Sequence, residues 1–519
     1  MLRSKFLVHR PSELIAIALV IGAAVWLRFS ALDEKPLHND EAVQGFKTGL
    51  LLESGAYRYD PTAHHGPTLY YLDLPLAWLR GEQTLAQLTV HSLRLLPAIA
   101  GVGIVIASLF LRTFIGAAPS LLAAAFLALS PIQVYFSRDF IQEPLLVFFT
   151  LVAGLWLFVY IRRPGLIPAV GFGLSAGLIH ATKETSLIIA VSLVAACLAE
   201  IAIDPSQART WWKAWRNKHH GVRDGFVALG VAATVSFLFF SSFLHHPAGI
   251  LDAFSAYFHG AGQSVGSDHT KPWGYYAGLL FGTVQTGRIQ SEMLIVGLSL
   301  IGILDAFTPS RQSGTPSRVL RVIGVASISQ LAIYSFIPYK TPWLLMVPEA
   351  GLCVLAGAGS VAILRILAPR YLPAIAGSIA LGAGLAHLGV QARAASNRYA
   401  ADPRNPLAYV QTVTDLLKVP DRVAGLASVS NRELTIKVFG EEYWPLPWYL
   451  RAYPLTGYWN TIPATPDADV IISTAGIESD LEPLLKDDYF AEFIGLRPGV
   501  VLIVRTRSDL WESYVATLE

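Results

Sequence analysis

The chain has 519 residues, of which 53% are hydrophobic and 15% are charged, and its mean hydropathy is +0.48. This composition excludes a single soluble core and indicates a protein that crosses a membrane several times. The formal net charge of +2 argues against nucleic acid as a partner.

Apolar runs that are long enough to cross a bilayer recur over the first three quarters of the chain. A span needs roughly 20 mostly apolar residues, and about eleven runs approach this length. The first run is interpreted as a signal anchor because it is long and many more follow it. The sequence therefore predicts a polytopic α-helical membrane protein. The predicted spans are 13–32, 93–111, 117–136, 143–161, 166–181, 185–203, 225–244, 289–307, 319–338, 343–364 and 371–391.

The distribution of lysine and arginine predicts the orientation of these spans. If the N-terminus with Arg3, Lys5 and Arg10 is cytoplasmic, the basic residues of the short loops fall on the cytoplasmic side of the inner membrane. Three larger segments then lie outside, namely 33–92, 245–288 and the chain after about residue 391. The basic loop residues are Arg112, Arg162, Arg163, the stretch 209–223, Arg311, Arg318, Arg321, Arg365 and Arg370.

Residues 392–519 differ in character from the transmembrane domain 1–391 and predict a small extracytoplasmic α/β domain. The runs "RVAGLASVS" (422–430), "ADVIIST" (468–474) and "VVLIVRT" (500–506) are expected to form strands. Charged stretches between them, such as "ESDLEPLLKDDYFAEF" (478–493), are expected to be helical.

Four polar segments fall on the predicted outer face. "LHNDEAVQGF" (37–46) follows the first span, and "SRDFIQEP" (137–144), "HATKET" (180–185) and "YKTPW" (339–343) connect later spans. Charged groups at a membrane boundary are costly unless they are paired or hydrated, so their common side indicates a polar site at the bilayer surface.

The charged residues of these segments suit two kinds of chemistry. A carboxylate can take a proton from an acceptor hydroxyl, or two can hold a divalent cation, for example Asp40 with Glu143. Arginine and lysine can neutralise a phosphate leaving group. The carboxylates are Asp40, Glu41, Asp139 and Glu143, and the cations are Arg138, Lys183 and Lys340.

Each of these residues also has a purely structural explanation. Asp40 and Glu41 can be a solvated helix start, because acidic side chains favour helix N-termini. Arg138 and Lys183 can extend along apolar surface to reach water. Lys340 can be an interfacial anchor, since lysine gathers with tryptophan at that depth.

The remaining candidates lie in other polar stretches of the outer loops. In "YDPTAHHGPTLYY" (59–71), His64 and His65 can ligate a metal or position a phosphate, or they can simply hydrogen-bond within the loop. Glu184 follows Lys183, and Lys271 opens the aromatic stretch "KPWGYY". Such aromatic stretches can hold sugars or prenyl chains, or rest on lipid headgroups.

The Asp-Glu pair that opens a long outer loop after the first span resembles the GT-C superfamily of polyprenyl-phosphate-dependent glycosyltransferases. This superfamily includes glycosyltransferase family 39 and the protein O-mannosyltransferases. The chain is more closely similar to the flippase-activity-associated family of archaeal-type glycosylation. The motifs that carry this likeness are "YDPTAHHGPTLYYL", "SRDFIQEP", "ATKET", "YKTPWLL", "NPLAYVQT" (405–412) and "EEYWPLPWYLR" (441–451).

The resemblance implies roles for individual residues. The acidic pair of the first loop, Asp40 and Glu41, corresponds to the base or to a metal-linked carboxylate. Asp139 and Glu143 compete for a second acidic position. The lipid-phosphate contacts correspond to Arg138, Lys183 and Lys340.

These observations predict an enzyme that moves a sugar from a polyprenyl-phosphate carrier to a glycan, lipid or protein acceptor outside the cytoplasm. The rival function is a lipid-linked saccharide flippase or its accessory protein. A flippase needs polar residues along its path through the bilayer, and Glu349 is the clearest one, unless it is a buried hydrogen-bonded carboxyl. An ion-coupled transporter would show paired repeats with broken helices, which the sequence lacks.

The predicted orientation can be tested with topology reporters. A reporter enzyme fused after residue 400, or a glycosylation tag near residue 262, is expected to be modified or active only outside the cytoplasm, because lysine and arginine place both positions there. Cytoplasmic activity of either reporter would remove the basis for a common outer site.

Overall fold

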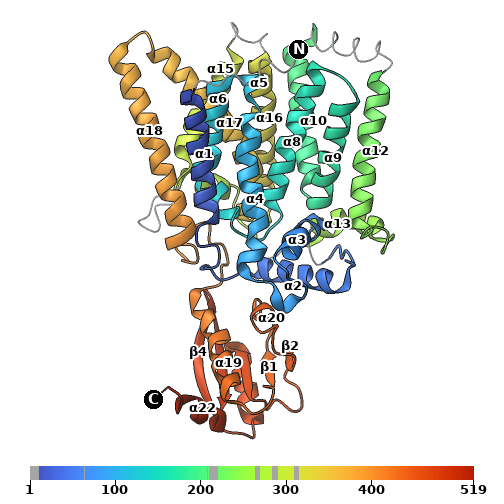
Figure 1. The fold of residues 1–519 in the computed structure, drawn as a ribbon, viewed down its shortest axis with the longest axis vertical. Coiled ribbons are helices and arrows are strands. Elements are labelled where there is room, and N and C mark those ends of the chain that lie inside the picture. Colours follow the sequence, from blue (N-terminus) through green and yellow to red (C-terminus); the bar gives the residue numbers. More distant parts are fainter. Residues whose placement is uncertain are drawn as a thin grey trace. The chain divides into compact units, whose positions relative to one another are not determined.

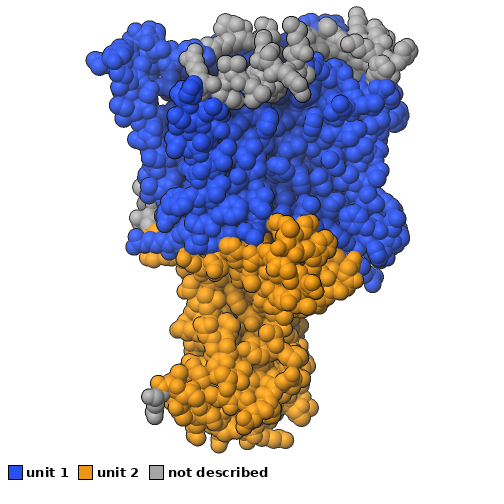
Figure 2. Space-filling view, viewed as in Figure 1, with its two compact units in different colours: residues 1–32, 56–73, 94–398 blue, residues 33–55, 74–93, 399–519 orange. Residues whose placement is uncertain are grey.

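The computed structural model describes residues 11–62, 65–206, 209, 220–263, 269–282, 290–308 and 315–518. Its contacts divide the chain into two compact units, which Figure 2 distinguishes by colour. Unit 1 comprises residues 1–32, 56–73 and 94–398, and unit 2 comprises residues 33–55, 74–93 and 399–519.

Unit 1 is a bundle of apolar helices whose long members run roughly parallel to one another (Figure 1). Two helices, α3 (Thr68–Leu79) and α4 (Val90–Leu109), have residues in both units. The other helices of unit 1 are α1 (Pro11–Phe29), α5 (Arg112–Ile115), α6 (Ala117–Leu129), α7 (Pro131–Phe136), α8 (Glu143–Arg162), α9 (Leu166–Thr182), α10 (Ser186–Ile203), α12 (His220–Phe240), α13 (Gly249–Gln263), α14 (Tyr275–Phe281), α15 (Met293–Phe307), α16 (Thr315–Phe336), α17 (Met346–Leu367) and α18 (Tyr371–Arg393).

Apolar helices coincide with all of the predicted spans. Within the described ranges, 8 helices are long and apolar enough to cross a membrane, and three shorter apolar helices, α6, α9 and α15, match further predicted spans. The chain is therefore a multi-pass membrane protein with a mostly helical fold. The number of about eleven spans stays a prediction, because the three shorter helices fall below the usual length.

The predicted span 117–136 is interrupted rather than continuous. Helix α6 ends at Leu129, and α7 begins at Pro131, whose ring lacks the N–H that a continuous helix would use. The Ser130 hydroxyl accepts a hydrogen bond from the Gln133 amide at 3.2 Å, and the Glu292 carboxylate accepts one from the Ile132 amide at 3.0 Å. These side chains satisfy the amides that the break exposes.

Unit 2 contains a five-stranded mixed sheet with the order β2-β1-β3-β5-β4. Strand β1 pairs in parallel with β2 and β3, whereas β5 pairs antiparallel with β3 and β4. In register, Val438 lies opposite Ile472, and Ile472 lies opposite Val504, so a row of buried apolar residues crosses the sheet. The strands are β1 (Ile436–Phe439), β2 (Thr456–Trp459), β3 (Val470–Thr474), β4 (Tyr489–Arg497) and β5 (Val500–Arg507).

The helices of unit 2 pack around this sheet or belong to the segments 33–55 and 74–93. They are α2 (Asn39–Ser54), α19 (Lys418–Val429), α20 (Leu446–Tyr449), α21 (Glu478–Leu481) and α22 (Ser508–Val515).

Two expectations for the C-terminal segment are wrong. The run 422–430 is not a strand but lies in α19, because Val419, Val423 and Leu426 recur at helical spacing and are all buried on one face. The stretch 478–493 is helical only up to residue 484, and its end forms β4, where Phe493 pairs with Ile503. The strands expected at 468–474 and 500–506 are confirmed as β3 and β5.

Candidate functional site

The polar turns of unit 1 gather at the end of the bundle where α8 begins, α9 ends and α10 begins, which we call the Lys183 end. The turn between α7 and α8, the turn 183–185 and the turn 337–345 all lie at the ends of neighbouring helices. Phe136 before the first turn contacts Trp343 of the third, with ring centroids 6.1 Å apart. Segments far apart in the sequence are thus brought together as the sequence predicted for them.

A buried ion pair joins the start of α8 to the turn after α9. The Lys183 ammonium group donates to Oε1 of Glu143, and both side chains are almost completely buried. Oε2 of Glu143 has no hydrogen-bond partner among the described residues. Because charges are costly to bury alone, each residue compensates the other in this apolar setting.

The neighbouring residue Glu184 holds the first outer loop. Its Oε2 lies 2.8 Å from Nδ1 of His65, and its Oε1 accepts a hydrogen bond from the Tyr59 hydroxyl at 3.2 Å. Burial opposes ionisation, but the charge and the hydrogen bond of His65 outweigh it and lower the pKa of Glu184 from 4.5 to about 2. Glu184 is therefore ionised throughout the neutral pH range.

The loop reaches this turn because Gly66 allows a close backbone approach. A Cβ atom on Gly66 would lie 2.2 Å from the carbonyl oxygen of Ala181, which no larger residue could tolerate without a backbone shift. Two residues later, the Thr68 hydroxyl donates to the Thr182 hydroxyl at 2.8 Å. The "HHGPT" and "ATKET" motifs therefore form one contact. His64 lies outside the described residues.

Arg138, predicted to bind phosphate, is directed at backbone instead. Its guanidinium group donates to the carbonyl oxygens of Leu27 at 2.9 Å, Ser30 at 2.6 Å and Ala31 at 2.9 Å. These carbonyls belong to the last turn of α1 and the residues after it, where a cation is favourable. Asp139, the residue after Arg138, is buried in the turn between α7 and α8.

Lys340 and Lys271, two further candidates, meet in a short pairing of the 269–271 and 338–340 segments. The Lys271 amide donates to the Pro338 carbonyl, and the Lys340 amide donates to the His269 carbonyl, both at 3.1 Å. The ammonium group of Lys340 donates to the carbonyl oxygens of Lys271, at 3.1 Å, and of Ile337. Lys340 is buried, and burial lowers its pKa.

In unit 2, the adjacent carboxylates Asp40 and Glu41 have different surroundings at the start of α2. Glu41 is completely buried, and its Oε2 accepts a hydrogen bond from the His38 amide at 2.9 Å, while Nδ1 of His38 accepts one from the Asp40 amide. This reciprocal arrangement is a capping box. The half-buried Asp40 carboxylate has no hydrogen bond or ion pair to any described residue.

The motif 441–451 supports the segment that carries these carboxylates. The Tyr449 hydroxyl accepts a hydrogen bond from the Leu37 amide at 2.9 Å, and a Cβ on Gly45 would lie 2.8 Å from the Trp448 ring. The Arg451 guanidinium group donates to the carbonyl oxygens of Leu85 and Leu88. The 405–412 motif contributes too, since the Gln411 amide group donates to the Pro36 carbonyl at 2.9 Å.

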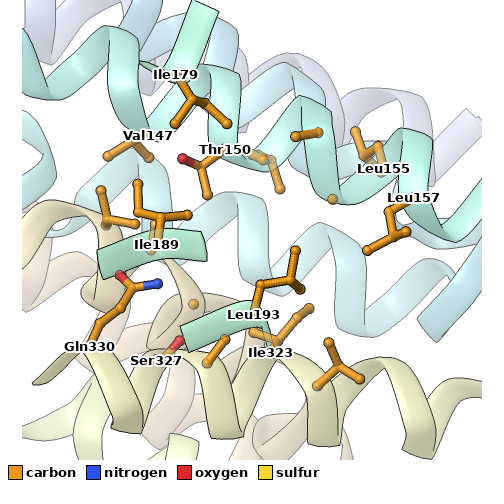
Figure 3. A pocket seen from close by; sticks show the side chains of 18 of the residues that line it. Val147, Thr150, Leu155, Leu157, Ile179, Ile189, Leu193, Ile323, Ser327 and Gln330 are labelled. Carbon is orange, nitrogen blue, oxygen red and sulfur yellow. The ribbon is translucent and has the colours of Figure 1, made fainter. Parts of the chain in front are cut away.

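An apolar cavity of about 400 Å³ runs through unit 1 between α8, α9, α10, α16 and α17. Val147 and Ser186 in its wall lie four residues after Glu143 and three after Lys183, so the cavity begins beside the ion pair. Figure 3 shows the polar atoms of Thr150, Ser327 and Gln330 among aliphatic side chains of the wall, and His180 and Ser186 also line the cavity. Thr150 and Gln330 were missed by the sequence analysis, because apolar spans give no sign of which faces enclose a cavity.

Glu349 belongs to a separate buried network rather than to this cavity. Its Oε2 accepts from the Gln133 side-chain amide at 2.7 Å, and its Oε1 accepts from the Cys353 thiol at 3.0 Å. The same Gln133 amide donates to the Met346 carbonyl, so the network ties α7 to the start of α17. These contacts support the interpretation of Glu349 as a buried hydrogen-bonded carboxyl.

Among the described residues, no group of three or more His, Cys, Asp and Glu side chains is placed to hold a metal ion. A cation shared by Asp40 and Glu143 stays a prediction, since these residues belong to different units.

No protein-family model and no curated protein matches the chain. Solved structures do. ArnT from Cupriavidus metallidurans bound to undecaprenyl phosphate is 15% identical with a TM-score of 0.62, and the match covers 95% of this chain and 98% of that one. The oligosaccharyltransferase AglB from Archaeoglobus fulgidus, in complex with an inhibitory peptide and a dolichol-phosphate, is 14% identical with a TM-score of 0.57, covering 97% and 77%. These matches confirm the resemblance to GT-C proteins at the level of the fold.

The buried ion pair predicts a specific pattern of stability in single and double variants. Lys183→Met should lower the thermal midpoint of the detergent-purified protein, because removing one partner of a buried pair costs about 3–5 kcal/mol. Glu143→Gln should do the same from the other side, whereas the double variant should recover most of the loss. Equal midpoints for the wild type and all three variants would show that the pair does not hold α8 to the turn after α9.

Proposed function

We propose that the protein transfers a sugar from a polyprenyl-phosphate carrier to an acceptor hydroxyl at the extracytoplasmic face of the inner membrane. The observation that carries the proposal is the position of the apolar cavity, which begins within one helical turn of the buried Glu143–Lys183 pair. A charged headgroup joined to a long apolar chain fits such a combination of polar end and apolar channel.

The fold supports the same substrate class. The matching ArnT structure is bound to undecaprenyl phosphate, and the matching AglB structure holds a dolichol-phosphate. Both ligands are prenyl chains that end in phosphate, and the predicted donor carries its sugar on such a phosphate.

Asp40 is the proposed base. Its carboxylate is at the start of α2, and it has no hydrogen bond or ion pair to any described residue that would occupy it. As the acceptor oxygen attacks the anomeric carbon, Asp40 takes the hydroxyl proton. Glu41 instead holds the helix start, because its carboxylate is already used by the His38 amide.

The bond between the anomeric carbon and the phosphate oxygen breaks in the same displacement, so the configuration at that carbon inverts. The electron pair stays with the prenyl phosphate, whose negative charge increases as it leaves. In this proposal Lys183 is the lysine nearest the departing phosphate. Arg138 and Lys340 instead stabilise the surrounding backbone, because both donate hydrogen bonds to backbone carbonyls.

The small number of available polar side chains within the helical bundle argues against the rival function, a flippase. Glu349, the clearest polar residue on a possible path, is engaged by Gln133 and Cys353. The cavity wall is almost entirely apolar, which suits a prenyl chain and not a hydrated saccharide.

A direct test uses the purified full-length protein in nanodiscs with a panel of radiolabelled polyprenyl-phosphate sugars. We expect prenyl-phosphate release that depends on an acceptor extract from the same membrane. Movement of labelled lipid between leaflets, without cleavage of the sugar–phosphate bond, would favour the flippase instead.

The adjacent carboxylates provide a matched pair of variants. Asp40→Asn should lower turnover by about 10²–10⁴-fold, since the amide keeps the shape but cannot take a proton. Glu41→Gln should have a much smaller effect on turnover, because an amide oxygen can still accept from the His38 amide. Both should fold, because the Asp40 carboxylate contributes only about 0.3–1 kcal/mol at a helix start and Glu41→Gln keeps the acceptor oxygen of the capping box. Full sugar transfer by a folded Asp40→Asn protein would remove Asp40 from the mechanism.

A further inference from the structure

The three basic residues predicted to bind phosphate are all engaged by groups of the protein. Lys183 is paired with Glu143, Arg138 donates to carbonyls at the end of α1, and Lys340 donates to two carbonyls. A phosphate at the Lys183 end would therefore meet positive charges that are already compensated or directed elsewhere.

His65 differs from these residues in its exposure and in its unused nitrogen. Nδ1 is fixed by Glu184 at 2.8 Å, and the His65 side chain is 38% exposed. Nε2, on the opposite edge of the ring, has no hydrogen bond to any residue in the described part of the chain. The close approach of Gly66 to Ala181 fixes the backbone beside His65, and the contact with Glu184 fixes Nδ1 of its ring.

We propose that protonated His65 donates a hydrogen bond from Nε2 to the phosphate of the polyprenyl-phosphate substrate, and that Glu184 is the residue that positions it. This inference rests on the proposed function for its ligand. An imidazolium whose Nδ1–H is held by a carboxylate presents its second N–H in a fixed direction, which is the arrangement that an anion needs.

The charge of the substrate changes in a way that suits His65. The sugar donor is a phosphodiester with one negative charge. When its bond to the anomeric carbon breaks, the bonding electrons remain on the phosphate oxygen, and the product is a monoester that gains a second charge. An imidazolium is attracted more strongly to this product-like state than to the donor, so it favours departure of the prenyl phosphate.

The surroundings leave few groups that titrate near neutral pH. Glu184 is ionised, and burial raises the pKa of Tyr59 far above neutrality. The imidazole of His180, on α9, is hydrogen-bonded to Ser236 at 2.5 Å, and it is the second titratable group to control for. The titratable and charged groups on the elements around the dyad include Tyr57, Arg58, Tyr59, Asp60, Tyr70, Tyr71, Glu143, His180, Lys183, Glu184 and Tyr257.

The test is a binding titration of the full-length protein with a short-chain prenyl methyl phosphate. This diester keeps one negative charge between about pH 5 and pH 8, so any change of affinity across this range comes from the protein. Because an imidazole carries a positive charge at low pH, the wild type should bind the diester more tightly at pH 5 than at pH 8. His65→Gln should weaken binding at low pH by about tenfold or more and flatten the profile, as expected for a lost charge-assisted hydrogen bond.

Three variants separate this role from a structural one. His65→Lys should restore affinity at low pH and keep it up to pH 8. Glu184→Gln leaves the imidazole in place but removes the carboxylate that fixes its Nδ1, so it should weaken binding at low pH while keeping the pH dependence that His65→Gln abolishes. His180→Gln alters the wall of the cavity and can change the overall affinity, but it should leave the pH dependence in place. A profile that is the same in the wild type and in folded His65→Gln would overturn the proposal.

Control ligands identify the bound group. Prenyl alcohol, which lacks phosphate, should show no dependence on His65. Inorganic phosphate should bind weakly, and binding as tight as that of the diester would overturn the assignment to a lipid. Sugar transfer that persists unchanged in His65→Gln would refute this inference alone, whereas His65-dependent lipid binding without any sugar transfer would refute only the proposed enzyme.

Discussion

The ion pair between Glu143 and Lys183 is the constraint on which the arrangement of unit 1 depends. Two opposite charges buried among apolar helices must stay together, so the first residue of α8 is fixed to the turn between α9 and α10. That turn also presents Glu184, which holds His65 of the first loop. One buried contact therefore sets both where the apolar cavity begins and where the loop attaches.

Much of the fold could be predicted from the sequence because the bilayer imposes a simple rule on composition. The apolar runs located the long helices of unit 1 to within about five residues, but not α3, α13 and α14, which lie in segments predicted to be outer loops. Prediction failed where the local sequence is compatible with two different secondary structures. The run 422–430 is apolar enough for a strand, but its periodicity suits α19, and the break at Ser130 follows from Pro131 inside an otherwise continuous apolar run.

The candidate site was predictable in its location within unit 1 but less so in the roles of its residues. Every second loop between successive spans lies on the same side of the membrane, and this rule was enough to predict that Glu143, Lys183 and Lys340 lie at the same end of the bundle. It could not show that Lys183 is paired, that Lys340 donates to backbone, or that Glu184 holds His65, because these contacts depend on side-chain geometry between distant segments. The cavity was equally hidden, since enclosed and lipid-facing positions of a span are both apolar.

The central claim is that the Lys183 end of unit 1 receives the phosphate of a prenyl lipid whose chain enters the cavity between α8, α10 and α16. A cryo-EM structure of the full-length protein in nanodiscs with a polyprenyl phosphate tests this most directly. The account predicts phosphate density within hydrogen-bonding distance of Nε2 of His65, with chain density continuing past Val147 and Gln330. Lipid density confined to the outer surface of the bundle, with the cavity empty and no density beside His65, would contradict it.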